Sequence, residues 1–234
     1  MIFRQLFDQK SFTYTYLLAD ESTRQTILID PVFEKIDEYL HLLEELSLTL
    51  YAAIDTHTHA DHVSAIGPLR DKTGCLSLLG EQSNNACVSQ TFKDGEKLTI
   101  GDLTITAIHT PGHTDDSYSF VAKNVNSILL FTGDTLLIRG SGRTDFQQGD
   151  ARQQYHSLFY KLLSYDDDAI VYPAHDYKGW SMSTIGEEKR NNPRLQVSTE
   201  DEYVTIMNNL DLPNPKMMDI AVPINQQCGK PKRM

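Results

Sequence analysis

Short apolar runs separated by polar turns make up the first part of the chain. Phe12 to Ala19 and Thr26 to Ile29 are rich in β-forming residues and flank the polar stretch Asp20 to Gln25, which predicts a β-hairpin. In Glu34 to Leu46, apolar residues recur every three or four positions, as on an amphipathic helix packed against a sheet. Leu48 to Asp55 is apolar again and predicts a further strand.

Strands and helices alternate in the remainder of the chain. Asp150 is a typical N-cap for a helix, and Thr199 with Glu202 has capping-box spacing for a helix to about Leu210, beyond which we expect irregular chain. This order of elements predicts an α/β fold with mixed sheets, formed as a single domain over residues 1–234. The other predicted elements are a helix at Gly67 to Lys72 and strands at Leu76 to Leu79, Lys97 to Ile100, Leu103 to Ile108, Ser117 to Ala122, Ser127 to Phe131 and Ala169 to Tyr172.

Composition and charge narrow the class of protein. The 234 residues are 40% hydrophobic and 23% charged, as in soluble globular proteins, and no apolar run approaches membrane-spanning length. The net charge of −11 argues against a nucleic-acid partner, which requires a basic surface. We therefore expect a cytoplasmic protein with no nucleic-acid or membrane partner, either a monomer or a homodimer.

The cysteines support the same compartment. Cys75, Cys87 and Cys228 form no CxxC pair, and their odd number leaves one residue over. This pattern predicts free thiols in a reducing compartment rather than a disulfide framework. We expect Cys228 to be a packed thiol, with a redox role as the alternative.

Candidate chemistry is concentrated directly after the strand that ends at Asp55. His57, His59, Asp61 and His62 fall within six residues, in an HxHxDH pattern. Histidines two apart on extended backbone point to the same face, and the chain can then turn to present the aspartate and the last histidine. Neutral imidazole and carboxylate groups bind zinc or iron at neutral pH, so the pattern predicts a metal site.

Three later segments repeat the arrangement of an apolar strand followed by a metal-capable residue. They lead to His113, Asp134 and His175. Ligands at the ends of several strands gather at one sheet edge, where open α/β folds place their sites. Gly112 and Gly133 adjoin two of these residues and allow the tight turns that bring the backbone close to a site.

This ordered set of residues resembles the metallo-β-lactamase superfamily. The resemblance implies an αβ/βα sandwich with mixed sheets and the metal site at the sheet edge. Within the superfamily, four flanking segments closely resemble those of the persulfide dioxygenases, also called sulfur dioxygenases. These segments are Phe131 to Gly149, His175 to Gly179, Asn192 to Leu195 and Ala221 to Asn225.

The family resemblance implies a specific metal centre and reaction. One Fe(II) per chain would be held by His57, His113 and Asp134, because two histidines and one carboxylate form the facial triad of non-haem iron. The implied reaction oxidises glutathione persulfide with O2 and water to sulfite and glutathione. The remaining residues of the set would orient the ligands or form a vacant second metal site; they are His59, Asp61, His62 and His175.

Three further residues are candidates for substrate binding. Arg139 and Arg143 follow the metal aspartate closely, and guanidinium groups suit the carboxylates of glutathione. Tyr177 lies two residues after His175 and could hydrogen-bond the ligand. The alternative for each arginine is a structural salt bridge.

Two other functions compete with the dioxygenase. A binuclear hydroxyacylglutathione hydrolase resembling glyoxalase II, with two zinc ions, would explain why all seven metal-capable residues are present. The third possibility is a non-catalytic protein that binds metal or persulfide. Because the flanking segments resemble the dioxygenases, an Fe(II)-dependent persulfide dioxygenase is the function that the sequence favours.

Overall fold

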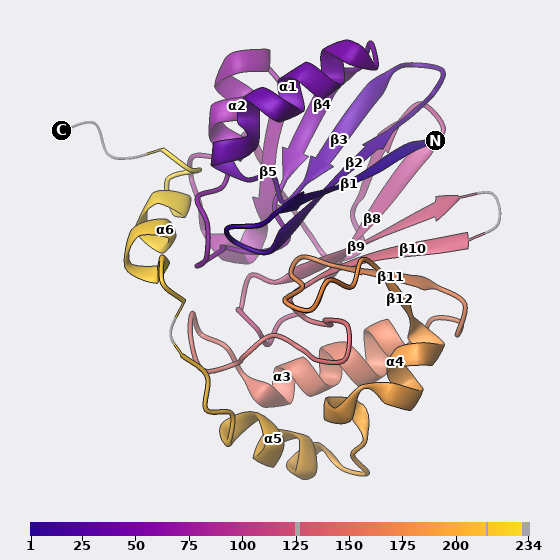
Figure 1. The fold of residues 1–234 in the computed structure, drawn as a ribbon, viewed down its shortest axis with the longest axis vertical. Helices are drawn as coiled ribbons and strands as arrows, with labels where there is room; N and C mark the ends of the chain where they lie inside the picture. The colour runs from indigo at the N-terminus through magenta and orange to yellow at the C-terminus, as the bar shows by residue number, and fades with distance from the viewer. Residues whose placement is uncertain (125–126, 214, 231–234) are drawn as a thin grey trace. The chain divides into compact units, whose positions relative to one another are not determined.

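The computed structural model describes residues 1–124, 127–213 and 215–230 (Figure 1). The chain divides into two compact units, each with many contacts between its own Cα atoms. The first unit contains residues 1–92 and 97–104 and the C-terminal segment described as 215–230, and the second contains residues 93–96 and 105–213. The single domain predicted from the sequence therefore stays a prediction, and the two units are described separately below.

The first unit is built on a mixed sheet. The strands lie in the sheet in the same order as in the chain. The first three are antiparallel to their neighbours, and the last three continue parallel to the third. Within the described residues the sheet has six strands, which are β1 (Ile2–Asp8), β2 (Thr13–Ala19), β3 (Gln25–Ile29), β4 (Thr49–Ile54), β5 (Leu76–Gly80) and β6 (Gln90–Phe92). The predicted hairpin is confirmed as β2 and β3, and the predicted strand before the HxHxDH motif is confirmed as β4.

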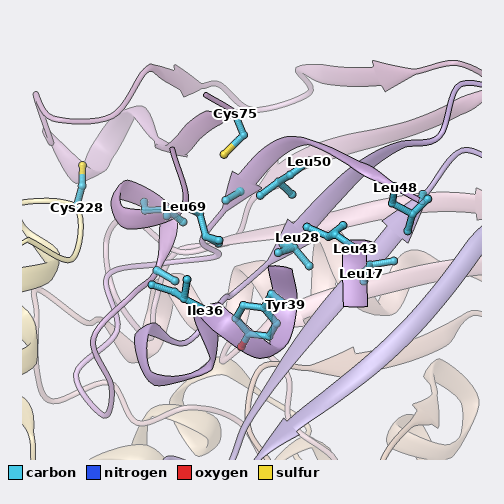
Figure 2. Close-up of a cluster of buried hydrophobic side chains, with 14 of the residues drawn as sticks. Leu17, Leu28, Ile36, Tyr39, Leu43, Leu48, Leu50, Leu69, Cys75 and Cys228 are labelled. Carbon is cyan, nitrogen blue, oxygen red and sulfur yellow. The ribbon is translucent and has the colours of Figure 1, made fainter. Parts of the chain in front are cut away.

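Helices α1 (Ile36–Glu45) and α2 (Ile66–Thr73) belong to this unit, and a 3₁₀ turn at Phe33–Lys35 precedes α1. Figure 2 shows side chains from α1, α2 and the sheet in one hydrophobic core. Tyr39 and Leu43 of α1 meet Leu17 and Leu28 of the sheet there. Burying such side chains stabilises the fold by roughly 1.5–3 kcal/mol each relative to exposure.

The C-terminal segment differs from the sequence prediction in two respects. We expected irregular chain, whereas Met218–Asn225 forms helix α6. We also expected free thiols, whereas Cys228 forms a disulfide with Cys87, so that the packed-thiol prediction for Cys228 is wrong. Pro223 inside α6 concealed the helix, and 141 positions separate the two cysteines, so no local spacing indicated the bond. Cys75 is a buried free cysteine.

The second sheet is also mixed. Strands β10 and β11 are parallel, while β9 is antiparallel to both β8 and β10. In the described residues its order is β12 (Ser183–Thr184), β11 (Ile170–Pro173), β10 (Ser127–Gly133), β9 (Tyr118–Asn124), β8 (Leu103–His109) and β7 (Lys97–Ile100). The unit boundary runs through β8, because residues 103 and 104 belong to the first unit and the rest of the strand to the second.

Helices α3 (Ala151–His156), α4 (Ile185–Asn191) and α5 (Glu200–Asn208) lie in the second unit. The predicted caps are confirmed: Asp150 accepts hydrogen bonds from two backbone N–H groups of α3, and Thr199 accepts one from α5. The chain after α3 continues through a π-helical turn at Ser157–Lys161 and a 3₁₀ turn at Leu162–Ser164. No helix among the described residues is long and apolar enough to span a membrane.

Each sequence-predicted metal residue follows a strand, as expected. The HxHxDH loop follows β4, Asp134 follows β10 directly, and His175 comes two residues after β11. His113 lies in the turn between β8 and β9. The short strands therefore deliver the candidate ligands within a few residues of their ends.

Candidate metal centre

The first unit gathers His57, His59, Asp61 and His62 in the loop after β4. The ring centroids of His57 and His59 are 4.1 Å apart, and those of His59 and His62 are 4.3 Å apart. All three rings are almost fully buried. Because three buried imidazolium ions at such spacings would repel one another strongly, the arrangement suits neutral imidazoles, the form that binds metal ions.

Two residues outside the predicted set fix the orientation of His57. The Thr56 hydroxyl donates to Asp30 Oδ2 at 3.0 Å, and the Thr56 backbone N–H donates to Asp30 Oδ1 at 2.6 Å. Since the only hydroxyl proton is used on the carboxylate, the Thr56 oxygen accepts from His57 Nδ1 at 2.9 Å. His57 therefore carries its proton on Nδ1 and presents the Nε2 lone pair, the form required of a metal ligand.

Asp30 also holds His59. His59 Nε2 lies 3.0 Å from Asp30 Oδ1, and both side chains are fully buried. Burial raises the pKa of the Asp30 carboxyl, whereas His57 and the Thr56 hydrogen bonds act in the opposite direction. The sequence contained a signal for this role, because Asp30 directly follows β3 (Gln25–Ile29), the parallel neighbour of the strand that leads to His57.

The other end of the motif has its own polar contacts. His62 Nδ1 lies 2.9 Å from Asp61 Oδ2, and the Thr13 hydroxyl donates to the same oxygen at 3.2 Å. The Asp61 carboxylate accepts a hydrogen bond from the Nδ1–H of the His62 ring, which leaves Nε2 as the atom of His62 suited to a metal. Asp61 is only partly buried.

The second unit gathers His113, Asp134 and His175 around one carboxylate. His175 Nδ1 donates to Asp134 Oδ1 at 2.7 Å, while His113 Nε2 lies 3.6 Å from Asp134 Oδ2. His113 Nδ1 donates to the Arg143 backbone carbonyl at 2.7 Å. In the neutral ring, His113 Nε2 is therefore an acceptor that faces a second acceptor. Two lone pairs so placed suit a cation that both could bind, so these residues fit a metal.

Glycines permit this geometry at two turns. Gly112 has φ +137° and Gly133 has φ +54°, both in the region that favours glycine. A Cβ at Gly112 would overlap the backbone of Gln154 in α3. The turn that carries His113 can therefore pack directly on α3 only with glycine at this position.

The candidate substrate residues have different surroundings. Arg139 forms ion pairs with Glu188 and, at 2.7 Å, with Glu187 of α4, and its guanidinium also contacts Ser183. Since the Glu188 side chain is fully buried, these contacts favour the structural salt bridge that the sequence left open for Arg139. The substrate role predicted for Arg139 remains a prediction.

Arg143 and Tyr177 are also in the second unit. Arg143 makes a two-pronged contact with Asp145 at 2.6 and 2.7 Å, and it donates to the Pro213 carbonyl at 2.7 Å. This pairing lowers the pKa of the Asp145 carboxyl. Tyr177 is 63% exposed, and its ring is nearly parallel to that of His175 with centroids 6.4 Å apart.

Comparison with known proteins places these features in a family. Residues 89–175 match the family described as the metallo-beta-lactamase superfamily. The persulfide dioxygenase ETHE1 of Homo sapiens, named as mitochondrial, is 44% identical over 98% of this chain and 89% of its own length. The crystal structure of ETHE1 from Myxococcus xanthus superposes with a TM-score of 0.94 at 48% identity, covering 98% of this chain and 100% of that chain. A probable hydroxyacylglutathione hydrolase of Schizosaccharomyces pombe is 30% identical over 88% of this chain and 90% of its own length.

The fold is that of the metallo-β-lactamase superfamily, which confirms the fold class predicted from the sequence. Within this superfamily, the chain belongs to the persulfide dioxygenase family.

Proposed function

We propose that the protein oxidises glutathione persulfide with O2 and water to sulfite and glutathione. The observation that carries the proposal is the 44% identity to persulfide dioxygenases over 98% of the chain. The reaction balances as one persulfide, one O2 and one water giving glutathione, one sulfite and two protons. The outer sulfur loses four electrons on going from the sulfane state to sulfite, and one O2 accepts four, so no further oxidant or reductant is needed to balance the electrons.

We propose that one Fe(II) is held by His57, His113 and Asp134. The assignment is supported by the order of the three motifs in the sequence and by the proton positions on the two histidines, each of which presents Nε2. Two imidazoles and one carboxylate suit Fe(II) and leave coordination positions open for the persulfide sulfur and O2.

The remaining polar residues keep these groups in position. Thr56 holds the proton on Nδ1 of His57, and the carbonyl of Arg143 does the same for His113. His175 occupies one oxygen of Asp134 and leaves the other directed at His113. Fixing each ligand before the metal arrives reduces the reorganisation that binding requires. His59, Asp61 and His62 support the loop in this proposal.

We propose that Arg143 and Tyr177 contact the glutathione part of the substrate. Arg143 is a planar donor suited to a carboxylate, and its present partner Asp145 is half exposed. A substrate carboxylate could exchange with Asp145 without leaving a buried charge uncompensated. For Arg139 the buried Glu188 makes such an exchange costly, so we favour a structural role.

The binuclear hydrolase is the second candidate. It is favoured by the presence of all seven metal-capable residues and by the 30% identity to the probable hydroxyacylglutathione hydrolase. Against it, the identity to that hydrolase is lower, 30% compared with 44% for the persulfide dioxygenase of Homo sapiens.

Metal analysis combined with oxygen uptake tests the proposal. Purified protein should contain about one iron per chain, the stoichiometry of a facial triad, and should consume O2 when glutathione persulfide is added. Two zinc ions per chain, with rapid hydrolysis of S-lactoylglutathione and no O2 uptake, would establish the hydrolase instead.

The compartment is a separate part of the proposal. The sequence predicts the cytoplasm, whereas the relatives are named as mitochondrial, and a disulfide is uncommon in reducing compartments. The cytoplasmic location expected from the sequence therefore stays a prediction. Fractionation of the source cells, followed by detection of the protein in each fraction, tests it.

A further inference from the structure

One side chain of the C-terminal segment forms hydrogen bonds with the backbone of His59 and His62, two residues of the HxHxDH motif. Asn225, the last residue of α6, is buried, and its Nδ2 donates to the carbonyls of His59 at 2.9 Å and His62 at 2.8 Å. Its Oδ1 accepts from the Ser64 backbone N–H at 2.8 Å. Both amide protons and the amide oxygen of Asn225 are therefore used on residues 59–64, which include three of the four candidate metal residues of the loop after β4.

The loop depends on these bonds for its shape. Residues 59–63 lie between β4 and α2, outside any strand or helix, and the carbonyls of residues 59 and 62 accept hydrogen bonds from the Asn225 side chain. A single planar amide that joins two carbonyls three residues apart fixes the turn between them. The backbone direction at residues 59 and 62 in turn sets where the two imidazoles lie.

Asn225 is itself held in place by the residues around it. Asn85 Nδ2 donates to the Asn225 backbone carbonyl at 3.0 Å, and two residues further along that loop Cys87 forms the disulfide with Cys228. Gly229 has φ +73°, and a Cβ there would overlap the Ser64 carbonyl. We call residues 225–229 the C-terminal clamp. The C-terminal clamp is attached to the loop after β5 by the hydrogen bond from Asn85 and by the Cys87–Cys228 disulfide.

We propose that Asn225 is a positioning residue for the metal loop and that the Cys87–Cys228 disulfide, by holding the C-terminal clamp in place, makes metal affinity depend on redox state. The inference rests on the proposed function only in treating His57 to His62 as part of a metal centre. It requires no particular metal and no particular substrate.

The chemistry of the switch is thiol–disulfide exchange. A dithiol reductant attacks one sulfur through its thiolate and forms a mixed disulfide, and its second thiol then closes to the cyclic disulfide. Two electrons pass from the dithiol to the protein, and Cys87 and Cys228 each end as a thiol. Cys87 is only partly buried, whereas Cys228 is fully buried, so attack takes place at the Cys87 sulfur.

Removal of the amide donors tests the positioning role. Asn225→Asp keeps the acceptor and the size of the side chain but replaces the donor to the two carbonyls with an oxygen. We expect the dissociation constant for Co(II), measured by absorption titration of the metal-free protein, to rise about 10- to 100-fold, as for other residues that orient ligands. The Co(II) ligand-field spectrum should also change. Gln226→Glu adds the same charge at the neighbouring exposed position and should leave both readouts unchanged.

Cys87→Ser tests the clamp without altering the metal loop, and it remains informative if Asn225→Asp fails to fold. We expect it to weaken Co(II) binding in the same direction. Wild-type protein treated with a dithiol, which is removed by gel filtration under nitrogen before titration, should match Cys87→Ser, while the variant itself should not respond to the dithiol.

Two results would overturn the inference. A folded Asn225→Asp protein with wild-type Co(II) affinity and spectrum would remove the positioning role. Reduced wild-type protein that binds Co(II) as tightly as the oxidised form would remove the redox dependence. Because Co(II) binding is measured without persulfide or O2, either failure is distinguishable from failure of the dioxygenase assignment, which oxygen uptake reports.

Discussion

His175 Nδ1 donates a hydrogen bond to Asp134 Oδ1 at 2.7 Å, within the second unit. The bond directs one carboxylate oxygen to His175 and leaves Oδ2 facing His113. In a binuclear centre the same histidine would in addition serve as a metal ligand through Nε2. The two candidate functions therefore assign different roles to the His175 side chain, and substitutions of His175 can distinguish between these functions.

His175→Asn is the sharpest such substitution, because the asparagine Nδ2 occupies about the position of the histidine Nδ1 and still donates. With a mononuclear centre we expect His175→Asn to retain iron and most O2 uptake, while His175→Ala loses the donor and binds iron about 10- to 100-fold more weakly. Iron content and oxygen consumption of both variants are the measurements. If His175→Asn lost as much metal and activity as His175→Ala, a ligand role through Nε2 would be indicated.

Thr56 tests the control of the His57 proton. Thr56→Val removes a hydroxyl that joins buried Asp30 to His57, so two buried polar groups lose a partner. We expect about 1–3 kcal/mol of lost stability and about 10- to 100-fold weaker metal binding. Thr56→Ser restores the hydroxyl and should recover most of both quantities. Denaturant unfolding of the metal-free proteins measures the stability, and metal titration measures the affinity. Equal effects of the two substitutions would argue against a role of the Thr56 hydroxyl in orienting His57.

Arg139 tests the choice between salt bridge and substrate contact. Arg139→Met leaves the fully buried Glu188 carboxylate without its cation, so we expect a loss of about 3–5 kcal/mol in stability. The KM for glutathione persulfide of the folded fraction should be unchanged. Arg152→Met is the control, because Arg152 is 57% exposed and pairs with Glu200 and Asp201 at the surface, where loss of the pairs should cost less than about 1 kcal/mol. A raised KM with normal stability would support the original substrate assignment.

Unfolding of the whole chain tests the single-domain prediction. The first unit is discontinuous in sequence, and β8 begins in one unit and continues in the other. Since neither unit contains the whole of β8, we expect both to unfold together in one calorimetric transition, with equal van't Hoff and calorimetric enthalpies. Two separated transitions, or a ratio well below one, would show that the units unfold independently.

The sequence identified the candidate metal ligands more completely than the residues that hold these ligands and the surrounding loops in position. Apolar strands with a metal-capable residue after them give a local signal, and the ligands are arranged accordingly at β4, β10 and β11. The ion pairs of Arg139 were hidden because α4 is a short, mostly charged helix with no apolar period along it. Asp30 and Asn225 contact the motif only through tertiary structure, far from it in the chain.

Contacts between residues far apart in the chain also explain the two predictions from the sequence that were wrong. Three scattered cysteines predicted free thiols, and only the fold brings Cys87 and Cys228 together. A proline inside α6 disfavours a helix because it removes one backbone N–H donor, and the segment is nevertheless helical. Both errors concern the segment that carries Asn225, so the least predictable part of the first unit is the part that contacts the metal loop.

The position of Asp30 has a consequence for protein engineering. Grafting residues 57–62 onto another scaffold would transfer the imidazoles and one carboxylate, but not Asp30, which directly follows the adjacent strand and receives the Thr56 and His59 contacts. The transplanted rings would be free to exchange tautomers and rotate, and the graft would bind a cation weakly. The smallest transferable unit is therefore the pair of parallel strands β3 and β4 together with the loops at their ends.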